Sequence, residues 1–294
     1  MTARQTLRRR FDVLTSEPLV VPGIGTPLEA RCAVSVGFEA VYQSGYATAA
    51  WRHGLPDIGL TAMEETASAL ASVAEAVDIP IICDADTGYG DVANVVRAVR
   101  RLERVGASAI QLEDQAWPKK CGHMRDKSVI PAEEHARKVM AALRARQDPD
   151  TLIIARTDAL GPLGIREALE RAKRYADVGA DAVFVEAPSS VDDLETIAAG
   201  LPGVILLANM SESGLTPQLS AREFHELGFD VVLFPTSALR IASRVLTDFF
   251  AELRAGGDSR GWLDRMMSLD ELNETVGLSQ TLAFEAALLA DFGS

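Results

Sequence analysis

The 294-residue chain is predicted to be an α/β protein, a (β/α)8 barrel with extra C-terminal helices. Short apolar, β-branched runs alternate with longer amphipathic stretches, as in right-handed βαβ units around a parallel sheet. Eight such units can be counted, and polar residues follow one apolar run after another, as at the catalytic end of a barrel. An open doubly wound sheet is the alternative architecture.

The strand candidates are short runs rich in Val, Ile, Leu and Ala, at residues 19–22, 40–43, 79–83, 109–112, 152–155, 182–185, 204–208 and 231–234. The stretches between them place apolar residues three and four apart, with charges on the opposite face. This pattern is typical of helices that cover a sheet. It predicts helices at residues 62–77, 92–105, 132–144 and 165–178.

A tail follows the eighth unit. No linker or low-complexity segment interrupts the alternation, so residues 1–294 are predicted to form one barrel domain with a helical extension over about 260–294. Residues 262–292 are expected to be helical. The apolar run 283–290 would leave a greasy patch on a monomer, and such patches usually mark interfaces.

The composition limits the partners and the compartment. A net charge of −13 argues against nucleic acid and against an anionic membrane surface. The polar, basic residues 1–10 lack the apolar core of a signal peptide, and no run of about 18 apolar residues could span a membrane. The cysteines, Cys32, Cys83 and Cys121, are odd in number and far apart, which indicates a cytoplasmic protein with free thiols.

Polar side chains come directly after the apolar runs. From the second run to the seventh these are Ser44 and Gly45, Asp84 and Asp86, Glu113 with Asp114 and Gln115, Arg156 with Thr157 and Asp158, Glu186, and Asn209. Asp and Asn also cap helices and form turns. Turn chemistry does not require so many carboxylates together with an arginine, so the carboxyl ends of the strands are expected to form an active site.

A magnesium site is predicted among these residues. Asp84 and Asp86 lie two apart, so on an extended segment they point to the same side. Glu113 ends the adjacent strand, and Asp57 lies in a loop behind it. Carboxylates without His or Cys suit Mg²⁺, with Mn²⁺ as a substitute, better than zinc. The alternative for Asp86 is that it merely caps the turn at residues 87–90.

The loop after the fourth strand holds the segment Lys119-Lys120-Cys121-Gly122-His123. A cysteine between lysines and a histidine lies in an electropositive setting, which predicts a reactive thiol. The alternative is an exposed loop cysteine without a role. No second Cys or His stands at zinc-ligand spacing.

The remaining cysteines and histidines are expected to have no catalytic role. Cys32, on a helix, and Cys83, inside a strand, are predicted to pack in the core. His53, His135 and His225 stand alone on loops or helix faces and are predicted to be surface residues.

These segments resemble the isocitrate lyase/phosphoenolpyruvate mutase superfamily. The matches run in order from about residue 20 to 245 and comprise Ser44-Gly45, Leu55-Pro56-Asp57, Asp84-Ala85-Asp86, Leu112-Glu113-Asp114-Gln115, Lys119-Lys120-Cys121-Gly122-His123, Arg156-Thr157-Asp158-Ala159 and Leu207-Ala208-Asn209-Met210. The Lys-Lys-Cys-Gly-His loop is the specific signal. The resemblance is to the short branch of 2-methylisocitrate lyases, dimethylmalate lyases, oxaloacetate hydrolases and carboxyphosphonoenolpyruvate mutases. It implies a barrel, Mg²⁺, a mobile loop over the site, and a homotetramer that exchanges C-terminal helices in pairs.

The resemblance also implies roles for the residues that match. Ser44, Gly45 and Arg156 would hold the carboxylate of an oxo acid, with Arg156 as a forked donor. Asp84 would bind the metal most directly, and the supporting carboxylates would be Asp57, Asp86 and Glu113. The residues facing the other product would be Gly122, His123, Glu186 and Asn209.

The chemistry needs an acid and a base. Cys121 is the candidate acid, with Lys120 and His123 nearby. The base is either Tyr42, at the end of the second strand, or a metal-bound water near Asp57.

Two departures from the nearest lyases bear on the substrate. Tyr46 follows Ser44-Gly45 where methylisocitrate lyases carry Gly, so the pocket beside the oxo acid would differ in size or shape. Ser211 and Ser213 share one side of an extended segment, where their hydroxyls could bind a second carboxylate. The long isocitrate lyases use an Asn-x-Ser-x-Ser segment in this way. The alternative is a serine-rich turn.

The predicted function is therefore that of a Mg²⁺-dependent carbon–carbon lyase. It would cleave a small 2-hydroxy di- or tricarboxylate, similar to 2-methylisocitrate or dimethylmalate, into a 2-oxo acid and a carboxylate. The alternatives are a carboxyphosphonoenolpyruvate or phosphoenolpyruvate-type phosphonomutase and an oxaloacetate hydrolase. A noncatalytic binding protein on a barrel fold is the remaining possibility, and the carboxylate cluster with Cys121 argues against it.

Overall fold

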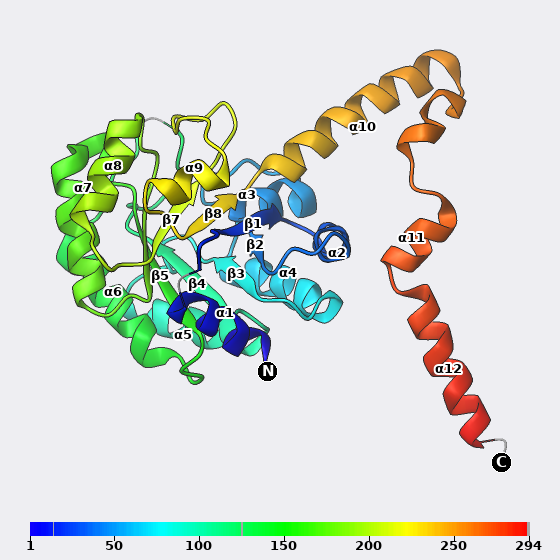
Figure 1. Cartoon of the computed structure of the whole chain (residues 1–294), viewed down its shortest axis with the longest axis horizontal. Coiled ribbons are helices and arrows are strands. Elements are labelled where there is room, and N and C mark those ends of the chain that lie inside the picture. Colours follow the sequence, from blue (N-terminus) through cyan, green and yellow to red (C-terminus); the bar gives the residue numbers. More distant parts are fainter. Residues whose placement is uncertain (14, 125, 293–294) are drawn as a thin grey trace.

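The computed structural model describes residues 1–13, 15–124 and 126–292, and it contains a closed barrel of eight parallel strands in sequential order (Figure 1). The strands are β1 Leu19–Ile24, β2 Val41–Gln43, β3 Ile81–Asp84, β4 Ala109–Glu113, β5 Leu152–Thr157, β6 Ala182–Val185, β7 Leu206–Asn209 and β8 Val231–Phe234. β1 pairs with β8 and closes the sheet. The predicted (β/α)8 barrel is confirmed, and the open sheet is excluded.

Helices surround the barrel. They are α1 Ala3–Asp12, α2 Pro27–Ser35, α3 Gly45–Thr48 with the π-helix η1 Ala49–His53, α4 Met63–Ala76, α5 Val92–Arg104, α6 Ala132–Ala145, α7 Leu160–Asp177, α8 Val191–Gly200, α9 Ala221–Glu226 and α10 Ser237–Gly256. The predicted helix bounds agree closely. α7 is the exception, because it begins five residues before the predicted start and has a non-helical break at Gly164, with φ 81°.

Alternation along each strand divides the core into an inner and an outer part. Ile82 points into the barrel, whereas its neighbours Ile81 and Cys83 pack outward against the helices. The burial of Cys83 confirms the prediction for that residue, while Cys32 on α2 is only partly buried. Leu7 and Phe11 of α1 join the inner cluster, so the N-terminal helix packs with the residues inside the barrel.

The C-terminal helices leave the barrel. α10 packs against β1 at its start and then projects outward, and η2 Arg260–Arg265, α11 Leu269–Thr275 and α12 Leu278–Phe292 form an arm beside the barrel (Figure 1). Arg31 of α2 donates to the carbonyl of Thr275 at 3.3 Å. No residue of α12 is buried, and Phe284 and Leu289 are 68% and 69% exposed.

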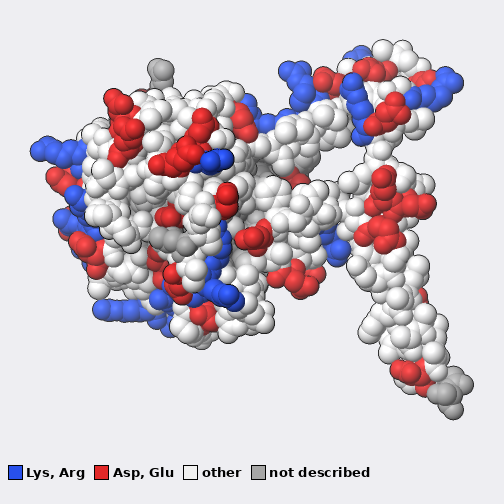
Figure 2. Space-filling view, in the orientation of Figure 1, with Lys and Arg blue, Asp and Glu red and all other residues white. Residues whose placement is uncertain are grey.

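The surface charge agrees with the composition. On the face shown in Figure 2, Lys and Arg are interspersed with Asp and Glu over the barrel, and most of α12 carries neither. None of the described helices is long and apolar enough to cross a membrane.

His135 corrects one prediction. It is fully buried on α6, where its ring lies 4.7 Å from that of Tyr175, instead of on the surface. Burial, together with the cations of Lys138 and Arg171, lowers the pKa of His135 to about 3. His135 is therefore a neutral core residue of the folded protein at physiological pH.

This burial predicts a pH dependence of stability. In the unfolded chain His135 binds a proton near its ordinary pKa of 6.5, while the folded protein does not bind it until about pH 3. The unfolded state therefore gains protons as the pH falls below 6.5, which costs the folded state about 2 kcal/mol by pH 5. His135→Leu should remove this part of the loss in urea titrations at pH 7.5 and pH 5. His53→Leu, at an exposed position, is the control. An unchanged pH slope in His135→Leu would show that the ring titrates normally.

Candidate active site

The carboxyl ends of the strands enclose a cavity of about 40 Å³. Its walls carry a guanidinium, a thiol, an imidazole and several carboxylates. The lining residues are Tyr42, Ser44, Tyr46, Asp57, Asp84, Cys121, Gly122, His123, Arg156, Phe184, Glu186, Asn209, Ser211, Leu233, Pro235 and Thr236. Residues predicted from five strand ends are thus brought together in one place, namely Ser44, Asp84, Arg156, Glu186 and Asn209.

Arg156 is the central cation of this cavity. Its Nη2 lies 3.0 Å from Glu186 Oε2 and 3.3 Å from Glu113 Oε2, and its Nε donates to Asp158 Oδ2 at 2.9 Å. The strand register explains the contact to Glu113, because Glu113 and Arg156 are paired across β4 and β5. Burial alone lowers the pKa of Arg156, but the three carboxylates raise it well above its ordinary value. Arg156 is therefore permanently charged in the folded protein.

The four predicted metal carboxylates are arranged differently from the expectation. In the described part of the chain, no three His, Cys, Asp or Glu side chains form a metal-binding group. The ammonium of Lys119 lies between Asp57 and Asp86 instead, 2.6 Å from Asp86 Oδ1. Asp84, at the end of β3, lines the cavity, whereas Asp86 does not. Asp84 accepts from the amide of Gly45 at 3.3 Å.

Asp86 is held by Lys119 rather than by the turn that follows it. Burial raises the pKa of Asp86 to about 6 although Lys119 opposes the shift. The alternative role for Asp86, capping of the turn at residues 87–90, is not seen among the described contacts. Glu113 is also buried, which raises its pKa well above the ordinary value, and its Oε1 has no hydrogen-bond partner.

The segment Lys119-Lys120-Cys121-Gly122-His123 between β4 and α6, which we call the cysteine loop, lines the cavity with Cys121, Gly122 and His123. The amide of Cys121 donates to the carbonyl of Asp57 at 3.1 Å. Gly122 lies directly on Arg156 and Glu186, so a Cβ at this position would collide with both side chains. Only glycine permits this close approach, which places Cys121 and His123 at the two sides of the contact.

The thiol of Cys121 is not activated in this conformation. Burial raises the pKa of Cys121 to about 11, with Asp57 and Glu186 adding to the shift. The predicted reactive thiol is not found in this conformation, because burial disfavours the thiolate and the nearby carboxylates add to this effect. Cys121 is therefore a protonated thiol at neutral pH, suited to donate a proton and not to act as a nucleophile.

His123 joins two loops. The amide of Leu215, in the loop between β7 and α9, donates to His123 Nδ1 at 3.1 Å. The proton of the neutral ring is therefore on Nε2, which faces Glu186 Oε1 at 3.6 Å and Asn209 at 3.3 Å. Burial lowers the pKa of His123, so the neutral form is favoured.

Tyr42 lines the cavity but is unsuited to the predicted role of base. Its hydroxyl accepts from Gln111 Nε2 at 3.0 Å. Burial and the charge of Asp84 raise the pKa of Tyr42 well above its ordinary value. A tyrosine accepts a proton only as the phenolate, which this environment disfavours.

Two predicted substrate residues lie elsewhere. Lys120 points away from the cavity and donates to the carbonyl of Asp126 at 2.9 Å, whereas its neighbour Lys119 is buried in the site. Ser213 adopts φ 62°, and its hydroxyl accepts from Arg240 at 3.0 Å, so only Ser211 of the serine pair lines the cavity. The extended segment assumed for the two serines is in fact a turn.

The residues that directly follow β2 agree better with the predicted substrate site. Ser44 caps α3 by accepting from the amide of Ala47 at 3.3 Å, and it lines the cavity. Gly45 lies so close to Asp84 that a Cβ would stand 3.0 Å from its Oδ2. Tyr46, 38% exposed, lies at the rim.

The sequence pattern assigns no individual role to the two charged residues that support Arg156, Asp158 and Lys127. Asp158 clamps Arg156 with both carboxylate oxygens, and Lys127 lies 2.7 Å from the same carboxylate. A usable signal for Asp158 was its spacing of two from Arg156, which puts both side chains on one side of an extended strand. Lys127 had no such signal.

A closed parallel barrel with a buried arginine, several carboxylates and a thiol at the carboxyl ends of its strands has the arrangement of a barrel enzyme. The family model described as phosphoenolpyruvate phosphomutase matches residues 11–254. The chain therefore belongs to the phosphoenolpyruvate mutase family, within the superfamily that includes the isocitrate lyases, as its sequence predicted.

Named relatives are similar over nearly the whole chain. The 2,3-dimethylmalate lyase of Eubacterium barkeri is 40% identical over 94% of this chain and 95% of its own. A probable 2-methylisocitrate lyase of Corynebacterium glutamicum is 42% identical over 92% of this chain and 88% of its own. These similarities support the prediction of a carbon–carbon lyase.

Solved structures agree. The crystal structure of 2,3-dimethylmalate lyase superposes with a TM-score of 0.92 at 34% identity, covering 98% of this chain and 96% of that one. A complex of phosphonopyruvate hydrolase with oxalate and Mg²⁺ gives a TM-score of 0.88 at 31% identity, covering 98% and 100%.

The raised pKa of Cys121 gives a testable pH profile. In a Cys32→Ser background, the rate of Cys121 alkylation by iodoacetamide should rise about tenfold per pH unit from pH 7 to pH 9.5, because only the thiolate reacts. Peptide mass spectrometry would measure the rate at this site, and the buried Cys83 serves as an internal control. A plateau near pH 8.5 would mean that the thiol titrates like a free cysteine.

Proposed function

We propose that the protein is a Mg²⁺-dependent lyase that cleaves the C2–C3 bond of a small 2-hydroxy di- or tricarboxylate, similar to 2,3-dimethylmalate or 2-methylisocitrate. The observation that carries this proposal is the thiol of Cys121 in the same cavity as Arg156 and Asp84, where burial raises its pKa. A lyase of this kind needs an anchor for an oxo acid, a cation site and a proton donor for the second fragment.

The residues at the strand ends fit a hard divalent cation. Mg²⁺ usually keeps several waters and binds proteins through one or two carboxylates, so a cluster of three is not required. Asp84 on the cavity wall would be the direct ligand. The buried Oε1 of Glu113, which has no hydrogen-bond partner, would bind through water. Asp57 and Asp86 would support the site together with Lys119. When bound, Mg²⁺ would polarise the hydroxyl and carboxylate oxygens of the substrate and favour loss of the hydroxyl proton.

The two products would be held by different parts of the cavity. Arg156 and Ser44 would bind the carboxylate of the oxo acid, with the amide of Gly45 next to Asp84. The donors opposite them are His123 Nε2, the amide of Asn209 and the hydroxyl of Ser211, and these would bind the second carboxylate. Tyr46 at the rim would limit the substituent that fits beside the oxo acid.

The reaction balances without a redox partner. A water molecule near Asp57 would accept the hydroxyl proton. The C2–O bond then becomes a carbonyl, and the C2–C3 electron pair passes to C3. The fragment that contains C3 then carries carbanion character next to its carboxylate. The thiol of Cys121 would protonate C3, and the resulting thiolate would be reprotonated once the loop opens. The raised pKa of Cys121 keeps the donor proton in place until this step.

A phosphonomutase and an oxaloacetate hydrolase are the alternatives. Both would use Asp84 and Arg156 in the same way. A mutase moves a phosphorus group and has no carbon to protonate, so the protonated Cys121 favours cleavage of a carbon–carbon bond. Oxaloacetate, assayed beside the 2-hydroxy acids, tests the hydrolase: its hydrolysis without cleavage of any 2-hydroxy acid would favour that alternative.

The test is a substrate panel with purified protein and Mg²⁺. We expect oxo-acid release from at least one 2-hydroxy diacid or triacid, complete loss of turnover with EDTA and recovery with Mg²⁺ or Mn²⁺. Asp84→Ala should abolish turnover while the fold persists by circular dichroism. Glu195→Ala, at an exposed position on α8, should retain it. Full turnover in EDTA would contradict the metal site, and turnover of phosphonates alone would favour the mutase.

Cys121→Ser tests the proton donor. An alcohol is far less acidic than a thiol, and a positioned acid contributes about 10²–10⁴-fold in rate. Turnover of the lyase substrate should therefore fall at least about a hundredfold, with Mg²⁺ affinity unchanged. Cys32→Ser should behave like the wild type. Wild-type turnover in Cys121→Ser would exclude the thiol as the acid.

We propose further that the protein is a cytoplasmic homotetramer. The three cysteines are free thiols, which supports a reducing compartment. The exposed apolar residues of α12 support an interface, because monomers rarely leave such surfaces uncovered. Removal of the residues after Arg260 should lower the mass measured by light scattering at micromolar concentration. A full-length monomer under the same conditions would contradict the assembly.

A further inference from the structure

Lys127 is a buried cation that the chemistry above does not use. Its side chain is only 4% exposed, although it belongs to the loop between β4 and α6. The ammonium makes two contacts: it donates to the carbonyl of Gly122 and to Asp158 Oδ1, the latter at 2.7 Å. Lys127 thus joins the tip of the cysteine loop to the body of the barrel.

Asp158 is a rigid attachment point. It is fully buried, its two carboxylate oxygens clamp Arg156 at 2.9 and 3.0 Å, and its amide donates to Asp114 Oδ1 at 2.8 Å. Asp114 is itself fixed by Arg171 at 3.0 Å and by the hydroxyl of Tyr175 at 2.9 Å. A contact to Asp158 therefore ties the loop to the arginine anchor.

The position of Gly122 makes this tie important. Gly122 lies on Arg156 and Glu186, with Cys121 and His123 on either side. The Lys127 contact to the Gly122 carbonyl holds this segment down from a site five residues further along the chain. Loss of Lys127 would also remove one of the cations that pair with the buried carboxylate of Asp158.

The loop must open in each catalytic cycle. A cavity of about 40 Å³ is far smaller than the several hundred Å³ that small-molecule sites usually have, so substrate cannot enter the closed state. The contacts of Lys127 must then break on opening and form again on closure. Their strength would set the balance between the two states.

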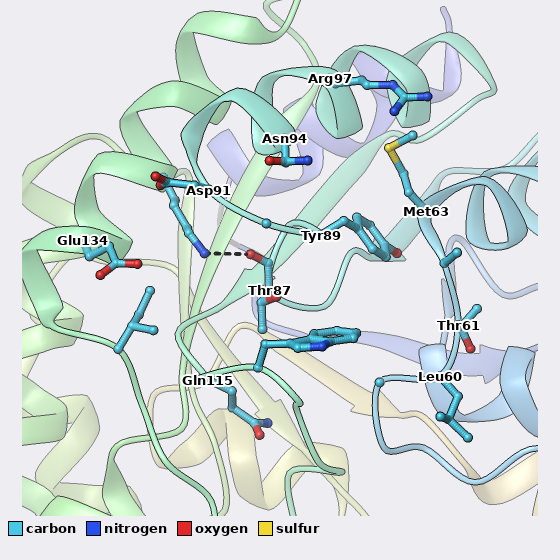
Figure 3. A pocket seen from close by; sticks show the side chains of 16 residues that line it. Leu60, Thr61, Met63, Thr87, Tyr89, Asp91, Asn94, Arg97, Gln115 and Glu134 are labelled. Atoms are coloured by element: carbon cyan, nitrogen blue, oxygen red, sulfur yellow. Dashed lines mark hydrogen bonds between the residues drawn. The ribbon is translucent and has the colours of Figure 1, made fainter.

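The larger cavity of about 700 Å³ on the outside of the barrel offers no comparable case. It lies between α4, α5 and α6, and its buried cation Lys138 already donates to the carbonyl of Thr87 at 3.3 Å (Figure 3). The amide of Gln115 in its wall is satisfied by the backbone of Lys120.

We infer that Lys127 is a positioning residue that latches the Cys121–His123 segment over Arg156 by bridging the Gly122 carbonyl and Asp158. The inference deepens the proposed function, on which its kinetic consequence rests. The latch itself concerns only the conformation of the loop. It can therefore be tested without substrate.

The first test is Cys121 alkylation by iodoacetamide at pH 7.5 in the absence of substrate and metal, in a Cys32→Ser background. Lys127→Met should raise the rate on the order of tenfold, because the open loop exposes the thiol and lowers its pKa toward the ordinary value. Lys127→Arg should stay within about threefold of the wild type, since it keeps a cationic donor. Lys173→Met, at an exposed position on α7, is the control for loss of a lysine.

The second test is steady-state kinetics with the lyase substrate. Lys127→Met should lower kcat on the order of tenfold, with a smaller change in KM, because Cys121 and His123 lose their alignment and Arg156 stays in place. Lys127→Arg should restore most of kcat. If Lys127→Met shows no thermal unfolding transition, the variant is not folded, and Lys127→Arg is compared with the wild type instead. The latch then requires that Cys121 be equally protected from alkylation in these two proteins.

The outcomes separate the latch from the function. An alkylation rate in Lys127→Met equal to that of the wild type would overturn the latch, whatever the substrate. Faster alkylation without any lyase turnover in the wild type would uphold the latch and remove the proposed function. An equal fall of kcat in Lys127→Met and Lys127→Arg, with both still folded and closed, would also count against the latch.

Discussion

The buried guanidinium of Arg156 is the interaction on which the site depends. It stands among Glu113, Asp158 and Glu186 at distances of 2.9 to 3.3 Å, in surroundings from which water is almost excluded. Removing the guanidinium would leave buried carboxylates without their shared counter-charge, and breaking a buried ion pair in this way typically costs about 3–5 kcal/mol. The barrel makes the arrangement possible because adjacent parallel strands present their ends at one edge, and the closed sheet fixes their spacing.

Charge balance around this arginine explains the remaining parts of the site. Lys119 compensates Asp57 and Asp86 on one side, and Lys127 compensates Asp158 on the other. Both lysines come from the loop that also carries Cys121, so the segment that holds the thiol also neutralises these carboxylates. The same burial that favours these ion pairs keeps the thiol of Cys121 protonated. The thiol of Cys121 therefore keeps its proton at neutral pH, beside the place proposed for an anionic substrate.

The sequence predicted those features that follow from periodicity. The strands, the outer helices and the gathering of Glu113, Arg156 and Asn209 all follow from the alternation of apolar runs and the parallel order of the strands. Loop residues lack such a constraint. The sequence therefore does not show that Lys119, and not its neighbour Lys120, enters the site. The positive φ of Ser213 is likewise invisible in a serine-rich segment. Burial of single side chains was the other gap: a helix pattern does not show that His135 faces the core, and a motif does not reveal that carboxylates surround Cys121.

In the proposed reaction, Cys121 delivers one proton to the carbon next to a carboxylate after the C2–C3 bond breaks. Turnover in ²H₂O tests it most directly, with the substrate that is cleaved fastest. For 2,3-dimethylmalate the products would be pyruvate and propionate. We expect one deuterium per propionate, in a single configuration at the carbon beside the carboxylate, because a fixed thiol reaches only one face. Propionate with deuterium on both faces, or no carbon–carbon cleavage of any acid tried, would contradict it.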